Sequence, residues 1–326
     1  MTTIAITGIG GFIGLRMAER AVDKGWTVRG FDIDPAGVSR AEAIGAEATV
    51  GDVCDPESYG EIFDDVDVVF HTAAIVDEAG DRARFYRVNV EGTRNIAEAA
   101  QRAGVERFVH LSSVMVYGFD YPEGVDETFE FPDVDNIYCE TKRESEKVAR
   151  SFHDPDGMGV IAIRPGDVYG AGSRPWILRP MEMMEAGLFT LPNGGRGVIN
   201  HVYVDNLLDA VFLALEQDAT GDVFNVTDDC ATESIEFYKY HAAMRGDGDL
   251  STAPAVLLKA FLTVAGPVFR LFGSEPPATP EAMNFMLRKH KVSTDKARSE
   301  LGYEPRVSLQ EGMKQVEQRL RAQGHL

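Results

Sequence analysis

The first half of the chain alternates short apolar runs, rich in β-branched residues, with segments whose apolar or small residues recur at helical spacing. The apolar runs predict strands at residues 3–8, 27–32, 46–52, 66–74, 107–113 and 160–165. The helical pattern is clearest at residues 12–25, 85–104 and 138–152. Apolar strands that alternate with helices are typical of a parallel sheet covered on both faces. The pattern therefore predicts a doubly wound α/β fold.

The pattern becomes less regular after Pro165, where loops rich in glycine and proline separate shorter elements. We expect residues 1–165 to form the main domain, with part of residues 198–228 returning to it. Residues 166–326 are expected to build mainly a smaller lobe over the carboxyl ends of the strands, where substrates bind in such folds.

Residues 254–273 are strongly apolar over about the length that spans a bilayer. Lys259, Gly266, Pro267 and Arg270 interrupt this segment, and charges are costly in hydrocarbon. We interpret it as an amphipathic element that covers an apolar pocket. Contact with a membrane surface is the less favoured alternative.

Composition narrows the function further. Lys and Arg number 32 against 52 Asp and Glu, a net charge of −20, which argues against nucleic acids and anionic membranes as partners. Cys54, Cys139 and Cys230 are widely spaced, so we expect neither a disulfide framework nor a metal site. The first residues, MTTIAITGIGG, lack a basic region before the first strand. We therefore expect no signal peptide and a cytoplasmic location.

A glycine-rich loop, TGIGGFIG, follows the first predicted strand and leads into the first predicted helix. Gly8 permits a tight turn, Gly11 lets backbone approach a pyrophosphate, and Gly14 allows close packing of helix on strand. Phe12 and Ile13 begin a helix whose N-terminus faces the phosphates. In this context the loop predicts a dinucleotide-binding Rossmann domain.

Asp32 ends the second predicted strand, 24 positions after Gly8. A carboxylate there can accept hydrogen bonds from the adenosine ribose hydroxyls, and it repels a 2′-phosphate, so we expect NAD rather than NADP. The alternative interpretation is a strand-end Asp that begins a turn.

Tyr138 and Lys142 lie four positions apart in a helical segment, so their side chains share one face. Taken alone, such a pair more often belongs to a solvated face. A dinucleotide loop and a pair of serines at the end of a strand, Ser112 and Ser113, precede it here. This combination favours a catalytic interpretation.

The whole chain resembles the extended short-chain dehydrogenase/reductase family, also described as NAD-dependent epimerases and dehydratases. The matching features are TGIGGFIG, Asp32, Asp52-Val53, HTAA, Asn89, SSVMVYG, Tyr138-x-x-x-Lys142, IRPGDVYG, HVYVDN and LGYEP. Their order along the chain is that of the family, and the pattern is most similar to its 3β-hydroxysteroid dehydrogenase-like branch.

The resemblance implies a role for each residue of the catalytic group. Tyr138 would be the general acid/base, and Lys142 would lower its pKa and hold the nicotinamide ribose. Ser113 would hydrogen-bond the same substrate oxygen, with Ser112 as its structural neighbour. The resemblance also implies a homodimer that meets through the helices at 85–103 and 138–152.

Further residues are expected beside NAD from this resemblance and from the small side chains that follow the strands. They are Asp52, Val53, Thr72, Ala73, Ala74, Asn89, Pro165 and Val168. Asn89 would order backbone near the cofactor, although a polar residue at a helix start is an equal alternative. Glu140, Glu144 and Glu146 are interpreted as solvated. Tyr117, Tyr169 and His201 fit either the pocket or its packing.

Three features favour an apolar secondary alcohol or ketone as substrate, of hydroxysteroid-like, long-chain or β-keto acid type. Asp167 stands where sugar-nucleotide enzymes typically have an Asn, and a carboxylate would repel a diphosphate. HVYVDN and the apolar segment 254–273 resemble the hydroxysteroid branch.

An epimerase or dehydratase of sugar nucleotides is the alternative, because Arg174 or Arg196 could reach a phosphate. A non-catalytic dinucleotide-sensing module is a third possibility, which Ser113, Tyr138 and Lys142 argue against.

Overall fold

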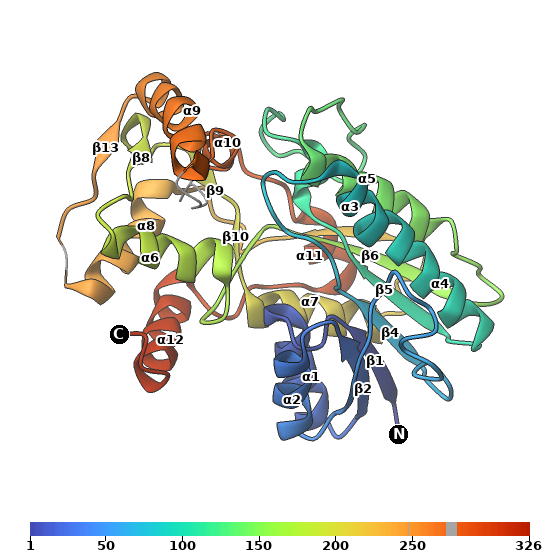
Figure 1. The fold of residues 1–326 in the computed structure, drawn as a ribbon. Coiled ribbons are helices and arrows are strands. Elements are labelled where there is room, and N and C mark those ends of the chain that lie inside the picture. Colours follow the sequence, from blue (N-terminus) through green and yellow to red (C-terminus); the bar gives the residue numbers. More distant parts are fainter. Residues whose placement is uncertain (247, 272–278) are drawn as a thin grey trace.

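The computed structural model describes residues 1–246, 248–271 and 279–326. A twisted sheet flanked by helices lies beside a smaller lobe built mainly from the C-terminal half (Figure 1). The predicted doubly wound α/β architecture is confirmed.

The central sheet has seven parallel strands in the order β11-β6-β5-β4-β1-β2-β3. Their bounds are β1 Thr3–Thr7, β2 Thr27–Asp32, β3 Glu47–Val50, β4 Val68–His71, β5 Arg107–Leu111, β6 Gly159–Pro165 and β11 Val223–Val226. The predicted strands at 46–52 and 66–74 are shorter than expected. The seventh strand, β11, comes from the segment that was expected to return to the sheet.

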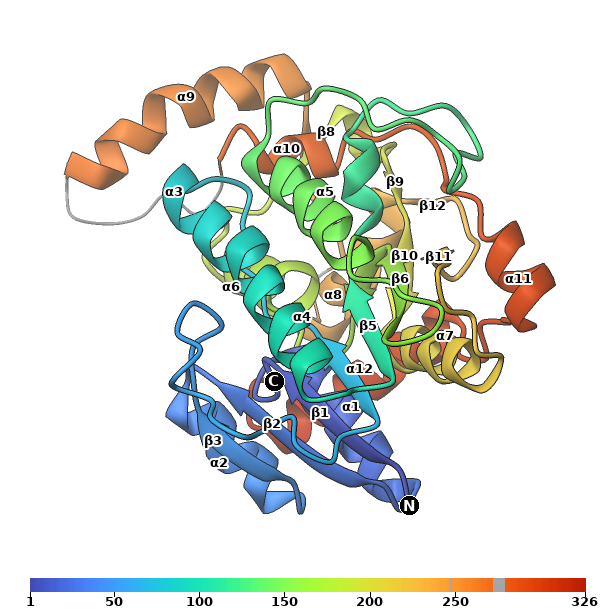
Figure 2. The same cartoon turned by 90° about the vertical axis from the view of Figure 1, so that its right-hand side faces the viewer.

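Helices cover both faces of this sheet (Figure 2). Among the first 216 residues, the helices that flank the sheet are α1 Phe12–Asp23, α2 Pro35–Ala43, α3 Arg82–Phe85, α4 Gly92–Arg102, α5 Ile137–Arg150 and α7 Val204–Glu216. A π-helical turn, η1 Tyr86–Glu91, joins α3 to α4, so the predicted helix at 85–104 forms with an irregular centre.

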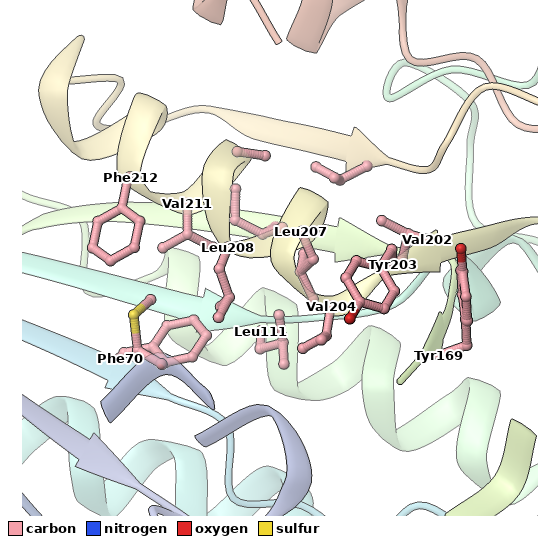
Figure 3. Packing of buried hydrophobic residues seen from close by; sticks show 14 of the residues in the cluster. Phe70, Leu111, Tyr169, Val202, Tyr203, Val204, Leu207, Leu208, Val211 and Phe212 are labelled. Carbon is pink, nitrogen blue, oxygen red and sulfur yellow. The ribbon is translucent and has the colours of Figure 1, made fainter. Parts of the chain in front are cut away.

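The alternation of side chains along β1 divides the core into two layers. Ile4 and Ile6 pack in the layer that includes α1 and α7, whereas Ala5 packs in the layer that includes α4. Figure 3 shows Leu207, Leu208 and Val211 of α7 against the sheet. Helix α7 is thus the apolar bridge between sheet and lobe.

The remaining elements are short and belong mostly to the lobe or to its junction with the sheet. They are η2 Val114–Tyr117, β7 Asp167–Tyr169, η3 Arg174–Leu178, α6 Arg179–Glu185, β8 Leu191–Pro192, η4 Asn193–Gly195, β9 Val198–Ile199, β10 His201–Tyr203, β12 Thr232–Glu233, α8 Ser234–Arg245, β13 Thr252–Ala253, α9 Ala255–Leu271, α10 Ala282–Phe285, α11 Asp295–Leu301 and α12 Leu309–Ala322. Three two-stranded sheets connect them, namely β10-β7, β12-β9 and β13-β8.

The apolar segment predicted at 254–273 forms helix α9, and its last two positions lie outside the described residues. Within the described chain, α9 lines no part of the cavity described below, contrary to the pocket cover that we expected. None of the helices in the described ranges combines the length and apolar character needed to cross a bilayer.

Candidate active site

A cavity of about 1050 Å³ opens at the carboxyl ends of the central strands. It is large enough for a dinucleotide, because ordinary ligand pockets measure ~300–1,000 Å³. All the predicted site residues except Gly14 and Asn89 line it. They are Gly8, Gly11, Phe12, Ile13, Asp32, Asp52, Val53, Thr72, Ala73, Ala74, Ser113, Tyr138, Lys142, Pro165 and Val168.

The glycine loop forms one wall of this cavity. Gly8 has a φ of +71°, and a Cβ on it would lie 3.1 Å from the backbone of Ala73, so the loops after β1 and β4 meet without side chains between them. Gly14 lies behind the wall, where a Cβ would lie only 2.1 Å from the Gly8 carbonyl oxygen. Gly14 therefore sets how closely α1 packs on β1.

The N-terminus of α1 faces the cavity through Gly11, Phe12 and Ile13. Its N-cap is Gly11, no side chain caps the first turn, and no acidic residue lies in that turn. The helix terminus carries a partial positive charge of about +0.5. Uncapped N–H groups next to a wall without side chains fit the pyrophosphate of NAD.

Asp32 is held by two backbone amides at the end of β2. Its Oδ2 accepts a hydrogen bond from the Gly10 amide (3.0 Å) and its Oδ1 accepts one from the Asp34 amide (2.9 Å). The turn interpretation and the cofactor interpretation are thus compatible, because the same contacts fix a carboxylate that also lines the cavity. A carboxylate fixed in this way fits a ribose diol.

Asn89 acts on the cavity indirectly. It is buried within η1, not at a helix start, and its Oδ1 accepts a hydrogen bond from the Ile75 amide (2.7 Å). Its Nδ2 donates to the Ile75 carbonyl (3.1 Å) and to Thr141 Oγ1 (3.1 Å). Since Ile75 lines the cavity, Asn89 orders backbone there, in line with the family resemblance.

Two elements bring the catalytic candidates together. Ser112 and Ser113 follow β5, whereas Tyr138 and Lys142 come from α5. Ser113 accepts a hydrogen bond from the Met115 amide (3.1 Å), and its hydroxyl also hydrogen-bonds Tyr138. Ser112 instead donates to Glu146 (2.6 Å). Of the two serines, Ser113 is therefore the one placed to share a substrate oxygen with Tyr138.

The electrostatics differ from the expected lowering of the Tyr138 pKa by Lys142. Burial raises the pKa of Tyr138 to about 12, and the Ser113 hydrogen bond opposes the rise. Lys142 donates to the Leu111 carbonyl (2.5 Å). Burial lowers the pKa values of His71 and His110, and the charge of Lys142 lowers them further. Burial lowers the pKa of Lys142 to about 8, against an opposing effect of Glu146.

The interpretation of Glu146 as a solvated residue is wrong. Glu146 is fully buried and accepts two hydrogen bonds from Arg164, Nε to Oε2 (2.8 Å) and Nη2 to Oε1 (2.6 Å). Arg164 Nη1 donates to the Tyr117 hydroxyl (2.6 Å), which donates to Asn225 (2.9 Å). Tyr117 therefore belongs to this network behind the cavity.

The other two glutamates of α5 also find partners at the surface. Glu144 pairs with Lys147 and is partly exposed, as expected. Glu140 is less exposed and pairs with Arg82 and Tyr86. The spacing of Glu146 from Lys142, one helical turn, was a signal that Glu146 shares the inward face. An arginine inside the apolar strand VIAIRP was a second signal, because a buried charge needs a partner.

The expected repulsion of a diphosphate by Asp167 is also wrong. Asp167 is buried, pairs with buried Arg288, and does not line the cavity. Its charge is compensated inside the protein and does not act on a diphosphate. His201 is hydrogen-bonded to Asp228 (2.9 Å) and Thr232 (2.9 Å), and Tyr169 is buried in the core, so both belong to the packing of the lobe.

Lys142→Met is expected to raise the free energy of unfolding at pH 7 by about 1–2 kcal/mol while removing activity. Methionine keeps the unbranched stem and removes a buried charge, and a tenfold change in an acid dissociation constant corresponds to about 1.4 kcal/mol. The gain should be complete below pH 8 and shrink as pH rises towards 10.5. In that range the Lys142 side chain of the wild type is a neutral amine in the folded protein but a charged ammonium in the unfolded chain. Thermal unfolding at several pH values measures this, and a lower melting temperature at pH 7 would contradict it.

Comparison with known proteins assigns the family. Residues 4–227 match the NAD dependent epimerase/dehydratase family. The 3-beta-hydroxysteroid dehydrogenase of Mycolicibacterium neoaurum is 30% identical over 95% of this chain and 89% of its own length. The 4-hydroxy-2-methyl-3-oxo-4-farnesyl-3,4-dihydroquinoline-1-oxide ketoreductase of Stigmatella aurantiaca is 27% identical over 96% of this chain and 95% of its own.

Among solved structures, the UDP-glucose 4-epimerase of Thermotoga maritima with UDP-glucose is similar in fold, with a TM-score of 0.80 at 24% identity over 99% of each chain. This likeness confirms the fold. The family match and the hydroxysteroid dehydrogenase relative confirm the resemblance that the motifs indicated. The chain belongs to the NAD dependent epimerase/dehydratase family, and it is an NAD-dependent oxidoreductase of the extended short-chain dehydrogenase/reductase type.

Proposed function

We propose that the chain interconverts a secondary alcohol and a ketone on an apolar substrate of hydroxysteroid-like, long-chain or β-keto acid type. The observation that carries this proposal is the placement of Tyr138 with Ser113 and Lys142 in one cavity with the predicted NAD-binding residues. Ile75, Val76 and Trp176 add apolar surface to the same cavity. The lobe formed mainly by residues 166–326 would hold the rest of the substrate.

The side chains divide the proton chemistry between them. In the direction of reduction, the Tyr138 phenol gives its proton to the substrate carbonyl oxygen, and in oxidation the phenolate accepts the proton of the alcohol. Ser113 hydrogen-bonds the same oxygen and holds it in place. Lys142 would stabilise the phenolate form when its ammonium turns from the Leu111 carbonyl towards Tyr138. The bound cofactor would supply a hydride to the carbonyl carbon as NADH in reduction, and it would accept one from the alcohol carbon as NAD⁺ in oxidation.

An apolar substrate is supported by two relatives, a hydroxysteroid dehydrogenase and a ketoreductase that acts on a farnesyl-bearing quinoline. An alternative is the epimerisation or dehydration of a sugar nucleotide. Arg84, Arg87 and Arg174 favour it, because they line the cavity and could pair with a diphosphate. Because Asp167 pairs with Arg288 inside the protein, repulsion between Asp167 and a diphosphate no longer argues against a sugar nucleotide.

Turnover assays separate these functions. The purified chain with NAD is expected to form NADH from at least one alcohol in a panel of hydroxysteroids, long-chain secondary alcohols and β-hydroxy acids. UDP- and dTDP-sugars are incubated in parallel and analysed for epimerised or dehydrated products. Conversion of a sugar nucleotide without net NADH, and no NADH from any alcohol, would reject the proposed dehydrogenase and establish the alternative.

We also propose that the chain is a homodimer that meets through the helices of residues 85–103 and 138–152. The support is the family resemblance. Light scattering on the purified chain is expected to give twice the monomer mass, and Arg94→Glu on the exposed face of α4 should lower that mass. A monomer at all concentrations would reject the dimer.

A further inference from the structure

Helix α9 carries a strip of exposed apolar side chains. Val256, Leu257, Phe261 and Val264 are exposed to 80%, 64%, 64% and 70% of their surface. At 100° per residue these positions fall within one side of the helix. The opposite side, with Leu258 and Leu262, is also apolar but partly buried. We call the first four residues the apolar strip of α9.

An apolar strip of this kind needs a cover, because exposed apolar surface in one patch marks an interaction site. A second copy of the chain is a poor cover by itself. A stable protein interface takes about 800 Å² from each partner, and four side chains on one helix supply roughly half of that. The substrate is no better, since α9 does not line the cavity in the described part of the chain.

The local charge distinguishes α9 from the rest of the surface. Between residues 250 and 271 the sequence has two cations, Lys259 and Arg270, and no Asp or Glu, in a chain with a net charge of −20. Lys259 is exposed beside the apolar strip. An apolar face bordered by a cation is typical of a helix that lies in the interface between lipid headgroups and acyl chains.

The length of α9 agrees with this orientation. Its 17 residues measure about 25 Å, which suits a helix lying flat on a bilayer with one side in the acyl boundary. The side with Leu258 and Leu262 would remain against the lobe. A bilayer also needs no matching shape, so a single exposed strip can bury its apolar area there.

We propose that α9 docks the protein on the surface of an electrically neutral lipid bilayer, with Val256, Leu257, Phe261 and Val264 inserted below the headgroups. The acidity of the remaining chain disfavours anionic lipids. This proposal uses only the exposure and charge of α9, and it stands whether or not the substrate is apolar.

Flotation of the purified full-length chain with vesicles tests the proposal. The wild type should float with phosphatidylcholine vesicles, equally in low and high salt, and float less with vesicles that contain phosphatidylglycerol at low salt. Leu257→Glu with Phe261→Glu should reduce the bound fraction at least about tenfold, because charges inserted below the headgroups are costly. Val50→Glu is the matched control, since Val50 is 52% exposed on β3 and lies outside α9.

Three results would overturn the proposal. The wild type could remain unbound with every vesicle, or the double variant could float as well as the wild type. Alternatively, the wild type could bind no vesicle, and light scattering could give the double variant half the wild-type mass. That result would assign the apolar strip of α9 to contact with a second copy of the chain. NAD titration verifies that each variant is folded. If the variant with two glutamates loses NAD binding, the test is repeated with Leu257→Ser and Phe261→Ser combined.

Discussion

Tyr138→Phe is expected to lower kcat by about 10²–10⁴-fold and to leave the affinity for NAD nearly unchanged. The substitution keeps the ring and removes only the hydroxyl, the group proposed to exchange a proton with the substrate oxygen. Ser113 can still hydrogen-bond that oxygen but has no base beside it, so binding should survive better than turnover. Steady-state kinetics with a substrate identified by the alcohol panel measures kcat, and fluorescence titration measures NAD affinity.

Tyr86→Phe is the matched control for this experiment. Its hydroxyl bonds Glu140 at the surface of η1 and does not line the cavity, so turnover should change little. Equal turnover in Tyr138→Phe and wild type would remove Tyr138 from the mechanism. Ser113→Ala should also lower kcat, and a smaller loss in Ser113→Ala than in Ser112→Ala would reverse the assignment of the two serines.

The parts of the fold that were predicted from sequence are those encoded over short distances. Apolar runs gave the strands of the first half, and TGIGGFIG placed Gly8, Gly11 and Gly14 because strand, turn and helix follow one another directly in the chain. The positions of Tyr138 and Lys142 were also local, since one helical turn separates them. The structure brings these separately predicted residues to one cavity.

The errors concern charges whose partners are distant or come from another element. Asp167 was interpreted from its place in a motif, but its charge is compensated by Arg288, more than a hundred residues later and in the lobe. Glu146 was interpreted as solvated together with Glu140 and Glu144. Only the packing of α5 on β6 shows that Arg164 meets it inside the protein. Local patterns indicate that Glu146 and Arg164 face inward, but they do not show which charges pair with each other.

Glu146→Gln is expected to lower the free energy of unfolding by about 3–5 kcal/mol. Arg164 keeps its charge in a fully buried position but loses the carboxylate that accepted two of its hydrogen bonds. Breaking one partner of a buried pair is costly for this reason. Glu144→Gln is the control, because Glu144 lies on the same helix but is partly exposed and bonds a surface lysine. It should change stability by less than about 1 kcal/mol. Chemical denaturation measures both.

The same residue should also affect catalysis, and a double variant separates this effect from stability. Glu146→Leu with Arg164→Met replaces the pair by apolar side chains and should recover most of the lost stability. It still removes the acceptor of Ser112 and the carboxylate that raises the pKa of Lys142. The Lys142 pKa should therefore fall below about 8, and the alkaline decline in kcat should move to lower pH. If Glu146 only stabilised the fold, the double variant would regain its stability and keep the wild-type pH profile of kcat. The pKa of Lys142 would then not depend on Glu146.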